Sequence, residues 1–385
     1  MKAELLVKQI ITKPSDFVEI DAENAETVSG LTKIPIMEKA GWPDVAYVSF
    51  AEAVEQGMTI TETGRVPELA IHNQTKYDVF IPAGQLFLSQ KGGWQDRMAL
   101  CDVFVGKGFQ GNIPVACVEK GRFHKRSDAD ADRYLRQLSV RRAAGSDFAG
   151  AHHLVSAAPM ECSLMSASET MGVRSSGVQE DIWRAVDVET HAADAKTQTG
   201  TFAEVYTKKK EGTSSFKIYE GEIGAAFLGD GKVLGLEFYH SGPAWQKFAE
   251  PVIKRYDVAV KDRAAAQNQK VLDEFMGRLA GAEAKKIPYN FIGDLVSLVQ
   301  EGITGSCLVK DATPLHLIAL PASKGQKGSG LNFSDLGFRQ RGQGTPFAAE
   351  EDIDEFIGSL RERSCTGFET GPELRYARRD CTGVR

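Results

Sequence analysis

Residues 84–125, GQLFLSQKGGWQDRMALCDVFVGKGFQGNIPVACVEKGRFHK, decide the fold that we expect for this chain. Two segments of this stretch, 98–105 and 113–118, are rich in apolar and β-branched residues and therefore predict strands. A glycine-rich loop joins them. We predict that the two strands pair as an antiparallel hairpin, which brings the residues that flank it to one end of a sheet.

Two polar clusters flank this hairpin, residues 95–97 before its first strand and residues 119–122 after its second. In the expected register Arg97 faces Gly121, so both clusters lie at the same end of the sheet. Neighbouring glycines such as Gly93 would let a ligand approach the backbone closely. The sequence therefore offers a place for a polar site.

These clusters suit a phosphate-bearing ligand. An arginine presents a planar fork that matches phosphate, and a neighbouring carboxylate can exchange a proton. We predict that Glu119 and Asp96 are catalytic. The predicted ligand-binding residues are Gln95, Arg97, Arg122, Gly93, Trp94 and His124. The alternative is a structural network, in which an ion pair between Arg97 and Glu119 locks the end of the hairpin.

The loop 106–111, GKGFQG, matches the GxGxxG pattern of dinucleotide-binding loops. That fingerprint requires a helix directly after the loop, whose N-terminus faces the pyrophosphate. Pro114 and the apolar residues around it indicate a strand instead, so we interpret the loop as a connection between strands. The P-loop, HExxH and GxSxG patterns are absent from the sequence.

The sequence predicts neither a metal nor a cofactor. His152 and His153 lie near Glu161 and Cys162, but this spacing matches no standard set of metal ligands. Cys117 is in phase with apolar neighbours, and we interpret it as a buried residue rather than a nucleophile. The six cysteines are far apart, which is typical of reduced thiols in a cytosol.

Composition places the chain among soluble globular proteins. Its 385 residues are 42% hydrophobic and 25% charged, with a formal net charge of -6. This balance argues against a nucleic-acid partner, since such proteins usually carry a basic excess. Charges interrupt the N-terminal stretch, and no apolar run approaches the roughly 20 residues of a membrane span. We expect a cytoplasmic protein without a membrane partner; the oligomeric state stays open.

The order of the expected elements favours an α+β fold, because strands come first and helices follow without regular alternation. We expect mainly antiparallel sheets with packed helices in the N-terminal half. One short helix there begins at Ser49, and Glu52 completes its capping box. The C-terminal half is expected to be helical, with helices at 243–256, 264–285 and 291–301.

Other segments complete this expectation. The first forty residues should form strands and loops, and Asp230-Gly231 predicts a hairpin turn. Residues 323–330, SKGQKGSG, should form a flexible loop. A last helix is expected at 348–363, followed by a polar tail.

Several pieces of the chain resemble one protein family, the ARG and rhodanese-phosphatase-superfamily-associated protein domain. The family is named for genomic neighbours that include ADP-ribosylglycohydrolases and rhodanese-like phosphatases. The matching pieces span about residues 40–260 and occur in the family's order. They are YVSFAEAVEQGMTITE at 47–62, GQL at 84–86, GGWQDR at 92–97, IPVACVEKGRF at 113–123, QEDIWRAV at 179–186 and GDGKVLGLEFY at 229–239.

The resemblance implies that residues 1–320 form the family's domain and that 321–385 are a C-terminal extension. It also implies a role around NAD or ADP-ribose metabolism, through neighbourhood rather than chemistry. We therefore expect the chain to bind or process a phosphate-bearing small molecule such as an ADP-ribose, NAD or nucleotide derivative. The alternative is a non-catalytic binding or interaction module whose arginine and glutamate clusters are structural.

Overall fold

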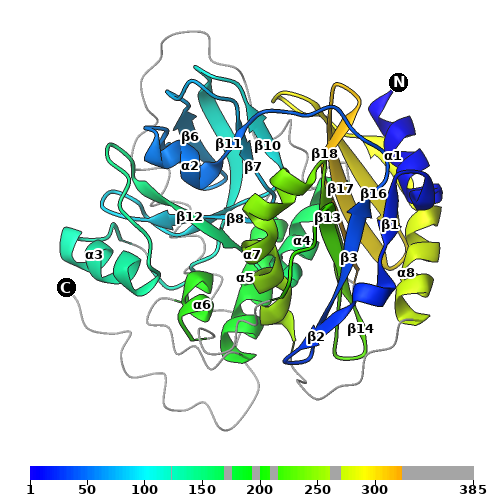
Figure 1. The fold of residues 1–385 in the computed structure, drawn as a ribbon. Helices are drawn as coiled ribbons and strands as arrows, with labels where there is room; N and C mark the ends of the chain where they lie inside the picture. The colour runs from blue at the N-terminus through cyan, green and yellow to red at the C-terminus, as the bar shows by residue number, and fades with distance from the viewer. Residues whose placement is uncertain (123, 169–175, 193–199, 209–215, 261–269, 323–385) are drawn as a thin grey trace, which may run out of the picture.

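The computed structural model describes residues 1–122, 124–168, 176–192, 200–208, 216–260 and 270–322. Within them, one large sheet lies beside two smaller sheets, and helices cover and separate the sheets (Figure 1). The loop expected at 323–330, the helix expected at 348–363 and the polar tail lie outside the described residues.

The large sheet has nine strands in the order β1-β3-β13-β14-β18-β17-β16-β15, with β2 also paired to β3. Its neighbours are antiparallel throughout. The predicted turn at Asp230-Gly231 is confirmed: both residues have positive φ, 52° and 71°, as a type I′ hairpin turn requires. The strands are β1 Val18–Ile20, β2 Glu26–Val28, β3 Leu31–Glu38, β13 Glu222–Gly229, β14 Lys232–Tyr239, β15 Glu283–Lys286, β16 Asp294–Gln300, β17 Ile303–Lys310 and β18 Thr313–Pro321.

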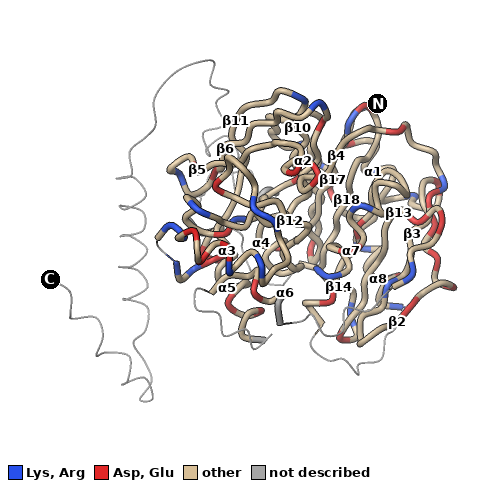
Figure 2. Tube along the Cα trace, turned by 60° about the vertical axis from the view of Figure 1, so that its left-hand side comes forward, with Lys and Arg blue, Asp and Glu red and all other residues tan. Residues whose placement is uncertain are grey.

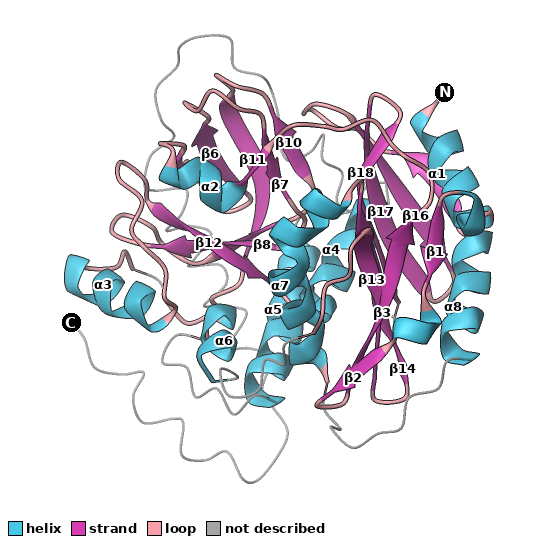
Figure 3. Cartoon of the chain, viewed as in Figure 1, coloured by secondary structure: helices cyan, strands magenta, loops and turns pink. Residues whose placement is uncertain are grey.

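Helices cover both faces of this sheet (Figure 3). On one face, α1 (Ala3–Thr12) and α8 (Lys270–Gly281) pack against each other and against the strands. The other face carries α4 (Ala157–Ser168) and α7 (Gly242–Ala259). Two separate apolar cores result, one on each side of the sheet.

The smaller sheets contain the stretch with which the sequence analysis began. A six-stranded sheet has the order β12-β8-β9-β11-β6-β5, and a three-stranded sheet has the order β10-β7-β4. Their strands are β4 Val48–Ser49, β5 Thr59–Glu62, β6 Glu68–His72, β7 Val79–Ile81, β8 Gln85–Ser89, β9 Arg97–Ala99, β10 Val103–Val105, β11 Gln110–Cys117 and β12 Phe148–Leu154. The helices of this part are α2 Phe50–Glu55, α3 Asp128–Gln137, α5 Ser176–Ala192 and α6 Val205–Lys208. The capping box of Ser49 and Glu52 is present at the start of α2.

The expectation of an α+β fold with a helical C-terminal half is wrong. The described chain is a mixed α/β structure, with antiparallel sheets in both halves and helices spread among them. Residues 291–301 show the reason. Most of this segment forms strand β16 (Asp294–Gln300), because β15 and β17 hydrogen-bond it on both sides and glycines with positive φ, Gly293 and Gly302, turn the chain at its ends. A short apolar run cannot by itself distinguish these two states.

The first forty residues also differ from the expectation, because they begin with helix α1. Ala3, Leu6, Val7, Ile10 and Ile11 are buried there. This spacing places them on one face of the helix, which packs against one face of the large sheet.

The antiparallel pairing expected between 98–105 and 113–118 forms only at 97–99 and 115–117, and in a different register. β11 pairs with β9 so that Cys117, not Gly121, faces Arg97. The chain leaves the six-stranded sheet after β9, and β10 pairs with β7 in the other sheet. The prediction that loop 106–111 is a connection without a following helix is confirmed, since β11 begins at Gln110.

Among the described helices, none combines the length and the apolar character that crossing a bilayer would need.

Candidate functional site

The ends of β8, β9 and β11 hold a buried polar cluster. Despite the different register, Asp96 and Glu119 meet there, because Asp96 directly precedes β9 and Glu119 lies two residues after β11. The backbone N–H of Asp96 donates to Glu119 Oε2 at 3.0 Å. The Gln95 amide donates to the Glu119 carbonyl at 2.7 Å. The structure therefore brings three of the predicted site residues together.

Arg122 uses its whole guanidinium group inside this cluster. Its Nε and Nη2 donate to the two Glu119 carboxylate oxygens at 2.9 and 2.7 Å. Nη1 donates to the carbonyls of Gly93 and His124 at 3.2 and 2.8 Å, and Nη2 also donates to the Ser89 hydroxyl. The five N–H groups of an arginine are thus all engaged. Arg122 is 2% exposed.

Asp96 is equally well satisfied. Ser89 donates to Oδ1 from its backbone N–H at 2.8 Å and from its hydroxyl at 2.9 Å. The hydroxyls of Tyr134 and Thr201 donate to Oδ2. Burial by itself would raise the pKa of Asp96, but neighbouring guanidinium groups, first that of Arg126, and these hydrogen bonds lower it. Asp96 is therefore a buried carboxylate that holds its surroundings in place.

Arg126 also belongs to the cluster, although it was not among the residues predicted from the sequence. Its Nη2 donates to Glu119 Oε1 and its Nε to the Ser89 hydroxyl, both at 3.1 Å. Its guanidinium carbon lies 3.7 Å from the centre of the Tyr134 ring. One feature of the sequence could have indicated Arg126: it directly precedes Ser127, the N-cap of α3. The start of a helix restrains the backbone there.

Arg97 meets the cluster through Gln95 rather than through Asp96 or Glu119. Its Nη2 is 3.7 Å from Glu62 Oε1, and its Nη1 donates to the carbonyl and the amide oxygen of Gln95 at 3.3 and 3.4 Å. The expected ion pair between Arg97 and Glu119 is absent from the described contacts, where Glu119 pairs with Arg122 and Arg126. The shifted register explains this, since Arg97 shares its face with Cys117 instead.

The other predicted residues lie at the edge of the cluster. Trp94 is half-buried, with Lys125 Nζ 5.6 Å from its ring centre, and His124 is exposed. Cys117 is fully buried, as predicted, and burial raises the pKa of its thiol to about 11. No group of three or more His, Cys, Asp or Glu side chains in the described residues has a geometry that could hold a metal ion.

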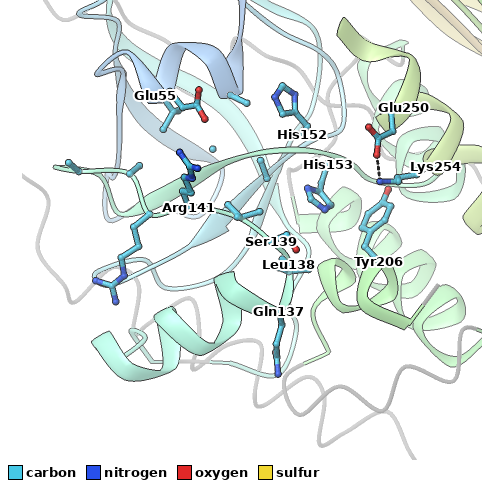
Figure 4. A pocket seen from close by; sticks show the side chains of 18 of the residues that line it. Glu55, Gln137, Leu138, Ser139, Arg141, His152, His153, Tyr206, Glu250 and Lys254 are labelled. Carbon is cyan, nitrogen blue, oxygen red and sulfur yellow. Dashed lines mark hydrogen bonds and ion pairs between the residues drawn. The ribbon is translucent and has the colours of Figure 1, made fainter. Parts of the chain in front are cut away.

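A cavity of about 760 Å³ lies elsewhere, and we call it the β12 cavity. It is lined by α2, residues 137–144, β12, Tyr206 and α7, and by none of the predicted site residues. Its titratable side chains lie around one hollow (Figure 4). They are Glu55, Arg141, Arg142, His152, His153, Tyr206, Glu250, Lys254 and Asp257.

The two adjacent arginines of the cavity differ. Arg142 is already paired with two acids of α3, Asp128 at 2.9 Å and Asp132 at 2.6 Å. Arg141 is exposed and has no ion pair or hydrogen bond with any described residue. Acidic and basic residues alternate around α3 (Figure 2). An anion would therefore be recognised by individual side chains rather than by a surface of one sign.

The opposite end of the cavity is partly neutralised. Lys254 Nζ pairs with Glu250 Oε1 at 2.5 Å, and this contact lowers the pKa of the Glu250 carboxyl. The rings of His153 and Tyr206 meet edge to face with centroids 5.1 Å apart. His152 is exposed. The spacing of the two histidines gave no sign of this cavity, because nothing local shows that α2 and α7 line it together with β12.

A second buried network joins the large sheet to the smaller ones. His316 of β18 lies between two acids: its Nδ1 is 2.9 Å from Asp102, and its Nε2 is 3.0 Å from Glu237. Arg255 of α7 donates to Glu237 at 2.8 Å and to the Ala83 carbonyl at 2.6 Å. Burial would lower the pKa of His316, but the two acids raise it to about 9. The imidazolium thus compensates two carboxylates in the interior.

The chain belongs to the family of the ARG and Rhodanese-Phosphatase-superfamily-associated Protein domain, whose model matches residues 19–320. The resemblance found in the sequence is thereby confirmed. Neither the curated proteins nor the solved structures include a significant match to this chain.

Proposed function

We propose that the chain binds a phosphate-bearing small molecule, such as an ADP-ribose, NAD or nucleotide derivative, in the β12 cavity. Arg141 carries the proposal, because it lines the cavity and has no partner among the described residues. A guanidinium with free donors can hold a phosphate through two parallel hydrogen bonds. His152 also lines the cavity and carries a donor, as does Lys254 at the opposite end, where it pairs with Glu250. The volume lies within the ~300–1,000 Å³ typical of small-molecule sites.

The cluster of Glu119 and Asp96 stays an alternative place for the ligand. Its arginines support binding less well, since the donors of Arg122 are all used and Arg97 is 2% exposed. Removing Arg122 from Glu119 to hold a phosphate would leave a buried carboxylate short of its partner, which is costly. The filled hydrogen bonds of Arg122 and Asp96 favour a structural role for these two residues.

Processing of the ligand would need an acid or base that can reach it. Glu55 and His152 are the candidates in the β12 cavity, because both are exposed on its lining. The geometry supports binding of the ligand more directly than its processing. A protein that only binds the ligand would use the same cavity residues.

Calorimetric titration with ADP-ribose tests this proposal. Arg141→Ala should weaken binding at least roughly tenfold, the value of one charged hydrogen-bonded contact. Arg136→Ala is the matched control, since Arg136 is exposed on nearby α3 but does not line the cavity. A loss in Arg97→Ala with unchanged binding in Arg141→Ala would move the site to the predicted cluster. An absence of binding across ADP-ribose, NAD and AMP would end the proposal.

We also propose a cytoplasmic location. The four described cysteines, Cys101, Cys117, Cys162 and Cys307, are buried free thiols, as expected in a reducing compartment. Fractionation of cells that express the chain tests this: recovery in an oxidising compartment would contradict it.

A further inference from the structure

One side of the β12 cavity carries two opposite charges that do not pair. Glu55 and Arg141 both line the cavity and both are exposed (Figure 4). Within the described residues neither of them has an ion pair or hydrogen bond, with each other or with a third group. Elsewhere on this surface charges do pair, as Arg142 does with Asp128 at 2.9 Å. The side chains of Glu55 and Arg141 are thus available to a ligand.

The backbone on both sides of Arg141 is fixed. The N–H of Val140 donates to the Leu135 carbonyl of α3 at 2.9 Å. On the other side of the two arginines, the backbone N–H of Ala143 donates to the Gln90 side-chain oxygen at 3.1 Å, and the Gln90 amide donates to the Ala143 carbonyl at 2.7 Å. Arg141 therefore projects from a short segment that is held at both ends, which reduces the entropy lost when it binds an anion.

Glu55 is fixed in a similar way. It is the last residue of α2, a helix that begins with the capping box of Ser49 and Glu52. Phe50 and Ala53 anchor the helix in the core. Gly57, with φ of 101°, then turns the chain away. The backbone of Glu55 consequently has a defined place beside the cavity.

The chemistry of this wall defines a class of ligand. A guanidinium binds a phosphate, while a carboxylate with free oxygens accepts hydrogen bonds and cannot donate them at neutral pH. A ligand that satisfies both has an anionic group beside neighbouring hydroxyl groups. Carboxylates are used in this way toward ribose hydroxyls in dinucleotide sites.

We infer that the β12 cavity selects a ribose phosphate, with Arg141 on the phosphate and Glu55 accepting hydrogen bonds from the ribose 2- and 3-hydroxyls. This inference rests on the proposed function and adds to it which side chain recognises the phosphate and which recognises the ribose. The carboxylate also disfavours ligands that place a second phosphate on these hydroxyls, since two negative charges would then meet.

Paired titrations with ribose 5-phosphate and 2-deoxyribose 5-phosphate, by calorimetry and ligand-observed NMR, test the inference. The wild-type protein should bind the ribose form about tenfold more tightly, because the deoxy sugar lacks one hydrogen bond to a charged acceptor. Glu55→Gln should bring the ratio toward one, and Arg141→Ala should weaken both ligands and preserve the ratio. Glu23→Gln, an exposed acid of the N-terminal region, is the control and should change neither value.

A ratio near one in the wild-type protein, with binding that still depends on Arg141, would overturn the ribose assignment and leave the proposed function standing. Failure of both sugars and of ADP-ribose to bind would overturn both. Thermal unfolding of each variant verifies that Glu55→Gln and Arg141→Ala are folded. Because both residues are exposed and unpaired, their replacement should leave the melting temperature unchanged.

Discussion

Replacing His316 by glutamine removes the cation that lies between Asp102 and Glu237 in the interior. Raising the pKa of the imidazole from 6.5 to about 9 corresponds to about 3 kcal/mol of unfolding free energy, since one pKa unit is worth about 1.4 kcal/mol. The folded pKa lies above the unfolded one. The contribution is therefore complete below pH 6.5 and is lost as the pH rises through 9.

The assay is denaturant unfolding of the wild-type protein and of His316→Gln between pH 6 and 9.5. At pH 6 we expect the variant to be about 3–5 kcal/mol less stable, because it leaves the buried Asp102 without its cation, while Glu237 keeps Arg255. The difference between the two proteins should shrink as the pH rises, since the wild-type imidazole loses its proton. His191→Gln, on the exposed face of α5, is the control. A difference that stays constant across this pH range would refute the reasoning.

Two further predictions concern the stretch at 84–125. Glu119→Gln should lower the unfolding free energy by about 3 kcal/mol, because in either orientation its amide N–H₂ faces a donor of Arg122, together with one of Arg126 or of Asp96. Unchanged stability with lost turnover would instead support the predicted catalytic role. Gly108→Ala should leave ligand binding intact and cost only about 1 kcal/mol, because Gly108 has a φ of 74° but an added Cβ meets nothing within 4 Å. Loss of nucleotide affinity in a folded Gly108→Ala protein would restore the dinucleotide interpretation of this loop.

The features that sequence predicted correctly depend on residues close to each other in the chain. The capping box of Ser49 and Glu52 involves contacts three residues apart, and the turn at Asp230-Gly231 requires only two residues with positive φ. The meeting of Asp96 and Glu119 was also foreseen. This prediction was correct although the predicted register was wrong, because each acid lies just outside the paired ends of β9 and β11.

Features that depend on distant partners were not predictable in this way. The strand expected at 98–105 is interrupted between β9 and β10. Asp102 lies in this interruption, and its carboxylate contacts His316, 214 positions away in the chain. The segment at 291–301 becomes a strand only because β15 and β17 flank it. The β12 cavity is lined by segments from Ala51 to Val258, so no local motif announces it.

A crystal structure of the protein in complex with ADP-ribose would test the central claim most directly. We predict a phosphate group in the β12 cavity with its oxygens at hydrogen-bonding distance from the Arg141 guanidinium. The cluster of Asp96, Glu119 and Arg122 should be unchanged in the complex, with its internal hydrogen bonds intact. A phosphate bound at Arg97 or Arg122, with the β12 cavity empty, would contradict the account.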